Sequence, residues 1–146
     1  MSDPWPALGP GEYWVDDPQE LWLRQVKPVE LNDVGDVGRA AFSLNDVERA
    51  SNRSSGALGT LQCARGAYEE AVQAQVATVG TWGVSVEEIH GAGFKCIDDH
   101  ETVTEPPKGH ASLAHHAVTL LSRRERRERR DELANAANAR GCLHAP

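Results

Sequence analysis

The chain has 146 residues and a mass of 15.9 kDa, which suits one compact domain. Hydrophobic residues make up 40% of it, enough to form a buried core, and the formal net charge is −7. No apolar run approaches the ~18 residues that argue for a membrane span, no secretory signal is visible at the start, and the three widely spaced cysteines predict reduced thiols in a cytoplasmic protein.

The charge is distributed unevenly along the chain. Residues 1–121 contain 8 Lys and Arg against 18 Asp and Glu, whereas residues 122–146 contain 7 against 4. This acidic body argues against a nucleic-acid-binding protein, which needs a dominant basic face. A small basic patch on such a body suits an acidic protein partner, a single phosphate group or the molecule's own acidic half.

The first part of the chain is expected to contain an arm followed by strands. Residues 1–17, rich in proline and tryptophan, are predicted to form an irregular arm pinned by Trp5 and Trp14, and residues 18–146 to form one domain. Alternating apolar and polar residues predict a strand over 21–26, which ends at Pro28. A second short strand is expected over 39–44. The Ser-, Asn- and Gly-rich segment 45–59 is predicted to be a long polar loop.

The rest of the chain is expected to alternate helices and strands. A helix is predicted from Thr60 to about Val79, because apolar residues recur there at spacings of three and four: Leu61, Ala64, Tyr68, Val72, Val76 and Val79. Strands are expected over 81–86, 94–97 and 110–120, with a helical turn at 87–91 and an acidic loop at 98–108. A last helix is predicted over 122–140, from Ser122 to a Gly141 C-cap. The predicted fold is α+β, a mostly antiparallel sheet packed by two main helices over 60–79 and 122–140.

The last predicted helix begins with six arginines in eight residues: Arg123, Arg124, Arg126, Arg127, Arg129 and Arg130. At ~100° per residue, all but Arg124 lie broadly on one side, and Leu133, Ala134 and Ala137 continue that side as an apolar stripe. Cations in a first helical turn oppose the helix dipole at a cost of ~0.3–1 kcal/mol each, which suggests a binding role for them. The alternative is a solvated face joined by the pairs Arg124–Glu128 and Arg127–Asp131.

From this charge reversal we expect a small accessory or regulatory binding protein, and we do not expect an enzyme. It would engage an acidic protein partner, a phosphate-bearing ligand or a second copy of itself. The residues expected to carry this function are Arg123, Arg126, Arg127 and Arg130, with Trp22 or Trp82 as an apolar anchor.

Three interpretations of the histidines remain open. On a strand, His110, Ser112, Ala114 and His116 share one face, and ordinary strand-surface histidines are the simplest reading. Zinc binding would draw its ligands from His110, His115, His116, Cys96, Cys142 and His144, although no paired knuckle spacing is present, so no metal site is assigned. The repeats His100-Glu-Thr102 and His110-Ala-Ser112 are similar to the paired motifs of two-histidine phosphoesterases, but they lie too close together for the two halves of that family.

A second pattern concerns Arg24 in the expected first strand, followed by Phe42-Ser43 and a Ser- and Asn-rich loop. This layout is similar to that of small ADP-ribosyltransferase-like toxins. The resemblance implies that Arg24 and Ser43 or Ser51 would hold NAD and that Glu87 or Glu88 would orient its ribose. The enzyme alternative is therefore a nucleotide-directed transferase or phosphodiesterase that uses Arg24, Ser43, Glu88 or His110. In the simpler reading, Arg24 pairs with an acid on the sheet surface.

Arg outnumbers Lys 12 to 3, and alanine is abundant. In this respect the chain resembles uncharacterised small proteins of GC-rich, actinobacterial-type bacteria. The likeness implies a bacterial source and no particular site.

Overall fold

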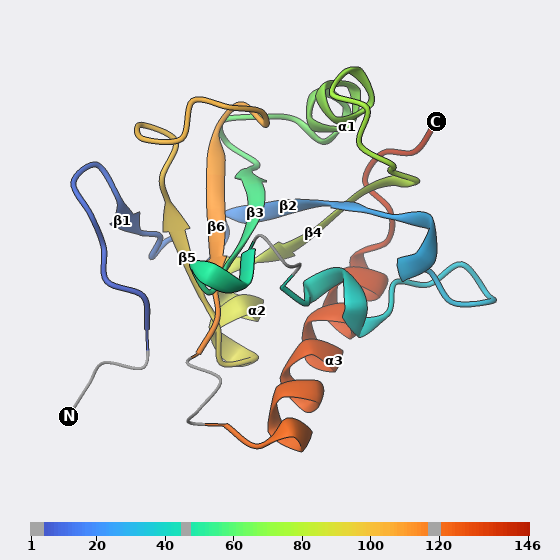
Figure 1. Ribbon diagram of the computed structural model, residues 1–146. Helices are drawn as coiled ribbons and strands as arrows, with labels where there is room; N and C mark the ends of the chain where they lie inside the picture. Colours follow the sequence, from blue (N-terminus) through green and yellow to red (C-terminus); the bar gives the residue numbers. More distant parts are fainter. Residues whose placement is uncertain (1–4, 45–47, 117–120) are drawn as a thin grey trace.

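The computed structural model describes residues 5–44, 48–116 and 121–146, which build one antiparallel sheet with helices on both faces (Figure 1). The strands lie in the order β1-β5-β6-β3-β2-β4. They are β1 (Tyr13–Trp14), β2 (Leu21–Val26), β3 (Arg53–Leu58), β4 (Gly80–Ser85), β5 (Lys95–Asp98) and β6 (His110–Ala114). The α-helices are α1 (Ala64–Gln73), α2 (Val86–Gly91) and α3 (Arg123–Arg140), and short 3-10 turns are η1 (Pro28–Glu30), η2 (Arg39–Phe42) and η3 (Glu48–Ala50). The predicted α+β fold with an antiparallel sheet is confirmed.

One face of the sheet carries the hydrophobic core. Trp22, Val84 and Leu113 project from three strands toward η2, α2 and α3, where Leu133 and Ala137 of α3 are fully buried. The Trp22 ring lies across β3, so that its Nε1 donates to the Ala111 carbonyl on β6 at 3.1 Å. Gly56 makes this crossing possible, because a Cβ there would stand 2.4 Å from the Trp22 ring. The core therefore depends on one glycine in the middle of β3.

The opposite face is more polar and lies under α1 and the N-terminal arm (Figure 1). The Thr81 hydroxyl on β4 donates to the Ala64 carbonyl at the start of α1. The arm is held by β1, which pairs with β5 at the sheet edge, and by Lys95, whose Nζ lies 5.2 Å from the Trp5 ring centroid and 4.9 Å from that of Trp14. The two tryptophans therefore do pin the arm.

Two predictions for the first half of the chain are wrong. Residues 39–42 form the 3-10 turn η2 and not a strand, because Ala41 and Phe42 turn inward together onto the core. The expected polar loop contains β3, a central strand that pairs with both β2 and β6. Its Ser-Gly-rich composition favours a loop locally, but the crossing of Trp22 over Gly56 makes that composition suitable for the sheet.

The first main helix is shorter than predicted. Helix α1 begins at Ala64, because the N-cap is Cys63, whose Sγ accepts from Gly66 N–H, while Thr60 bonds Glu20. The buried residues of α1 are Ala67 and Ala71. The predicted apolar stripe is wrong as well, since Val72 and Val76 are 49% and 42% exposed.

The second main helix is confirmed in its bounds and in its caps. Ser122 Oγ accepts from Glu125 N–H, the Glu125 carboxylate accepts from Ser122 N–H, and Gly141 ends the helix with φ of 85°. Leu133, Ala134 and Ala137 are buried as expected. The structure agrees within a residue or two with the predicted strands over 21–26, 81–86 and 94–97 and with the predicted turn at 87–91. Strand β6 covers the start of the strand expected over 110–120, and residues 117–120 lie outside the described part of the chain.

Candidate anion-binding site

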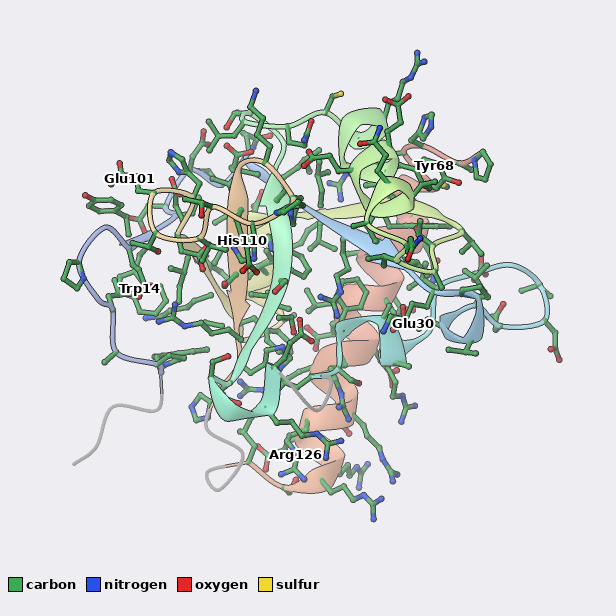
Figure 2. The ribbon with its side chains drawn as sticks, turned by 45° about the horizontal axis from the view of Figure 1, so that its top comes forward. Trp14, Glu30, Tyr68, Glu101, His110 and Arg126 are labelled. Atoms are coloured by element: carbon green, nitrogen blue, oxygen red, sulfur yellow. The ribbon has the colours of Figure 1, made fainter. Side chains whose placement is uncertain are left out.

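A pocket of about 530 Å³ opens beside the first turns of α3. Its lining residues come from α3 and from five other stretches of the chain: Ser43, Leu44, Arg49, Asn52, Gly93, Phe94, His115, His116, Leu121, Arg123, Arg126, Arg129 and Arg130. None of these described lining residues is an acid. Figure 2 shows nitrogen-tipped side chains gathered around Arg126 at this end of the helix.

The arginines are positioned by main-chain and hydroxyl acceptors. Arg126 Nη1 donates to the Leu121 carbonyl at 2.8 Å, and Arg129 Nη1 donates to the Gly93 carbonyl at 3.1 Å. Gly93 has φ of 84°, and a Cβ on it would stand 2.4 Å from Arg129 Nη1, so only glycine lets this guanidinium lie against the backbone. Arg130 Nη1 donates to Ser43 Oγ at 3.1 Å. These neutral acceptors orient the guanidinium groups.

The charge balance of this helix differs from the predicted solvated face. Among the ion pairs of the described residues, the Arg123–Arg130 run contributes one, Arg124 with Glu128 at 3.0 Å. The expected partner of Arg127, Asp131, binds Arg39 instead at 2.9 Å. Arg127 itself is exposed and does not line the pocket.

Arg130 is a partly buried cation with other positive charges close to it. Partial burial, followed by the positive charges of Arg126 and Arg39, lowers the pKa of Arg130. Its Nε is buried without a hydrogen-bond partner. A guanidinium has five N–H donors, and the contact to Ser43 uses one of them. At least one donor of this guanidinium, the Nε–H, is therefore unused in the part of the chain that the structure describes.

Two histidines form the wall opposite the arginines. His115 is buried, its Nε2 lies 2.7 Å from Ser54 Oγ, and burial lowers its pKa to about 3, so the ring is neutral near pH 7. The half-buried His116 ring packs edge-on against Trp5 at a centroid distance of 5.2 Å, and its Nδ1 is buried without a partner. Phe94 packs edge-on against His115 at 5.1 Å.

The four residues of the enzyme alternative have separate structural partners. Arg24 Nη1 donates to Glu48 Oε2 at 3.1 Å and to the Ser55 carbonyl at 2.6 Å, and its Nε donates to Ala41. Glu48 Oε2 also accepts from Ser55 N–H at 2.7 Å. The side chains of Arg24 and Glu48 therefore bond the main chain of Ser55, where β3 is no longer paired with β2. Arg24 therefore pairs with an acid, in a nearly buried position.

Ser43, Glu88 and His110 are not brought together with Arg24. Ser43 accepts from Arg130 in the arginine pocket. Glu88 closes the capping box of α2 with Ser85 and binds Arg140 Nη1 at 2.6 Å.

His110 Nδ1 lies 2.6 Å from Asp99 Oδ1, and Ser112 Oγ donates to the other oxygen of the same buried carboxylate at 2.6 Å. His110 and Ser112 share one face of β6 as predicted, well away from Arg126 in Figure 2. Asp99 lies at the start of the segment predicted as an acidic loop, but it is only 2% exposed.

The predicted apolar anchors belong to the core. Trp22 is fully buried and Trp82 is 7% exposed, so neither ring offers a surface to a partner. In the part of the chain that the structure describes, no group of three or more His, Cys, Asp and Glu residues is arranged to hold a metal ion. No helix in that part is long and apolar enough to cross a membrane.

Sequence reasoning identified part of this site. Of the arginines predicted to bind, Arg123, Arg126 and Arg130 line the pocket and Arg127 does not. The helical wheel places Arg129 on the same side as these arginines, but Arg129 is not among the residues predicted to bind. Asn52, Gly93 and Phe94 are not predicted as site residues either. In the sequence Gly93 is only a glycine just before a predicted strand. Such a glycine can mark a place where another group lies close to the backbone, but the sequence does not show that this group is Arg129.

Comparison with known proteins gives no relative for this chain: no family model matches it, and no curated protein or solved structure is significantly similar to it.

Proposed function

We propose that this protein acts by binding, as an accessory or regulatory component, and that it takes a phosphate-bearing ligand in the arginine pocket. The observation that carries the proposal is Arg130, a half-buried guanidinium with unused donors among like charges. Arginine is the residue best suited to phosphate, because its planar fork donates two parallel hydrogen bonds to two oxygens.

The shape of the site favours a ligand over a flat protein surface. A cavity of about 530 Å³ falls within the range of about 300–1,000 Å³ that holds small molecules. Burial of Arg130 beside the positive charges of Arg126 and Arg39 raises the free energy of the unliganded protein. A bound phosphate would relieve that repulsion, so the ligand should stabilise the fold as well as occupy the pocket.

The proposal is tested by thermal unfolding with pyrophosphate, inorganic phosphate or chloride at matched ionic strength. A ligand at one hundred times its Kd stabilises the native state by about 2.7 kcal/mol. For a domain near this size, each kcal/mol raises Tm by about 2–4 °C. We expect pyrophosphate to raise Tm by several degrees and chloride to leave it unchanged.

The variants that separate the pocket from the helix are Arg129→Gln, Arg130→Gln and the matched control Arg127→Gln. All three remove one charge from the same helix, but Arg127 is exposed and lies outside the pocket lining. The pocket variants should lose the pyrophosphate shift and the control should keep it. An equal loss in all three would show a diffuse charge effect. No shift in the unmodified protein, with capture of an acidic polypeptide such as polyglutamate, would favour the protein-partner interpretation instead.

A further inference from the structure

The arginine pocket is larger than a phosphate group, and its wall has two chemically different sides. On the α3 side lie the guanidinium groups of Arg123, Arg126, Arg129 and Arg130. The rest of the lining mixes rings and aliphatic groups with polar side chains, one of them a fifth arginine: Ser43, Leu44, Arg49, Asn52, Gly93, Phe94, His115, His116 and Leu121. A ligand that fills the whole pocket therefore has an anionic end and a body that offers both apolar and polar surface.

The ring side also offers polar atoms to a ligand. Asn52 Nδ2 donates to the His115 carbonyl at 2.8 Å, which orients the amide and leaves Oδ1 as an acceptor. Asn52 is held in a left-handed conformation with φ of 60°, and its carbonyl accepts from His115 N–H, so its position beside the pocket is fixed by main-chain contacts. The neutral His115 ring is engaged by Ser54, whereas His116 Nδ1 has no partner.

This combination distinguishes among the classes of organic phosphate. A sugar phosphate or polyol phosphate is polar on all sides and would leave the ring wall unmatched. An acyl phosphate would match the rings but would leave the Asn52 amide without a donor. A nucleobase has flat faces for the rings and polar atoms along its edge.

Resting on the proposed function, we infer that the ligand of the arginine pocket is a nucleoside phosphate, with its phosphates on α3 and its base against His116 and Leu121. His116 and Leu121 are the lining residues chosen for the test, because both are half-buried and present part of their side chain to solvent.

The test compares ligands that carry the same diphosphate with and without a base. Calorimetric titrations of the full chain use ADP, GDP, CDP and UDP against methyl diphosphate, at one ionic strength. Stacking of one base on a side chain contributes on the order of tenfold in affinity. We expect at least one nucleoside diphosphate to bind about tenfold more tightly than methyl diphosphate.

Variants of the ring wall then locate the base. His116→Ala and, separately, Leu121→Ala should weaken the binding of the nucleoside diphosphate much more than that of methyl diphosphate, so that the preference for the nucleoside is lost. His100→Ala, in an exposed loop outside the pocket, is the matched histidine control and should change neither affinity. Because His116 also packs on Trp5, Leu121→Ala keeps the test valid if the histidine variant fails to fold.

The outcomes separate the inference from the proposed function. If all the diphosphates bind equally, the base has no site and the inference is overturned, while phosphate binding stands. If the base preference survives in both variants, the base lies elsewhere and the inference is also overturned. If no diphosphate binds, the proposed function fails, and the inference fails with it.

Discussion

Removing one partner of the buried pair of Arg24 and Glu48 should be among the most destabilising single substitutions in this protein. The two side chains are 13% and 8% exposed. Glu48→Ala leaves the Arg24 guanidinium without its counter-charge and Ser55 N–H without its acceptor. Removing one partner of a buried ion pair costs about 3–5 kcal/mol, a large part of the 5–15 kcal/mol that holds a typical domain folded.

Urea unfolding followed by tryptophan fluorescence measures this cost. If the dependence of the free energy of unfolding on urea concentration keeps the same slope, the shift in the midpoint urea concentration gives the loss of stability. The matched control is Glu128→Ala, which breaks the pair with Arg124, whose side chains are 60% and 89% exposed. Exposed helical pairs of this kind contribute about 0.3–0.5 kcal/mol. The double variant Arg24→Met with Glu48→Met should recover much of the loss, because it removes both charges together. A Glu48→Ala protein no less stable than Glu128→Ala would refute the structural role assigned to Arg24 and would reopen its role in NAD binding.

Three further outcomes follow from other parts of the molecule. Gly56→Ala should destabilise the protein by at least ~1–3 kcal/mol in the same urea assay, because its Cβ meets the Trp22 ring; an unchanged midpoint would mean that the ring does not cross β3. The pKa of His115 is near 6.5 in the unfolded chain and about 3 in the native state, so the free energy of unfolding should fall as the pH drops from 6.5 to 3. His115→Gln should flatten this dependence of stability on pH. Parallel curves for the two proteins would contradict a buried neutral ring. Burial raises the pKa of the Cys96 thiol, so a thiol reagent should modify Cys96 only after unfolding. The two exposed thiols, Cys63 and Cys142, should react in the native state. Immediate modification of all three thiols would contradict the burial of Cys96.

The elements predicted most accurately from the sequence are those with local signals. Ser122 followed by Glu125 is a capping box, and Gly141 supplies the positive φ that ends the helix, so α3 was predictable from a few residues at each end. Strand β2 was predictable from its apolar residues, because Trp22, Leu23 and Val26 are buried whereas Arg24 and Gln25 are less so. In each case the determinant lies within the element itself.

The elements that were missed have determinants elsewhere in the chain. Strand β3 has a loop-like composition, and its glycine makes sense only when Trp22 of another strand lies on it. Periodicity predicted a long apolar face for α1, but the sheet accepts only Ala67 and Ala71, small residues that carry little hydrophobic signal. Local pattern therefore overestimated the helix and underestimated the strand.

The site shows the same division. The arginine run was evident from charge alone, and it lies at the end of α3 beside which the pocket opens. The pocket was not predictable, because its opposite wall comes from Asn52, Phe94 and His116, which the fold brings to α3 from three separate segments. Gly93 gains its meaning only from Arg129 lying against it.

We propose that the arginines of α3 bind an anion in the pocket that Arg123, Arg126, Arg129 and Arg130 line. Isothermal titration of pyrophosphate into the unmodified protein and into Arg130→Gln tests it most directly. The account predicts one site per chain, and an affinity that falls in the variant by about tenfold or more, since hydrogen bonds to charged groups contribute ~1.5–3 kcal/mol. No measurable heat at millimolar pyrophosphate, or equal affinity in both proteins, would contradict it.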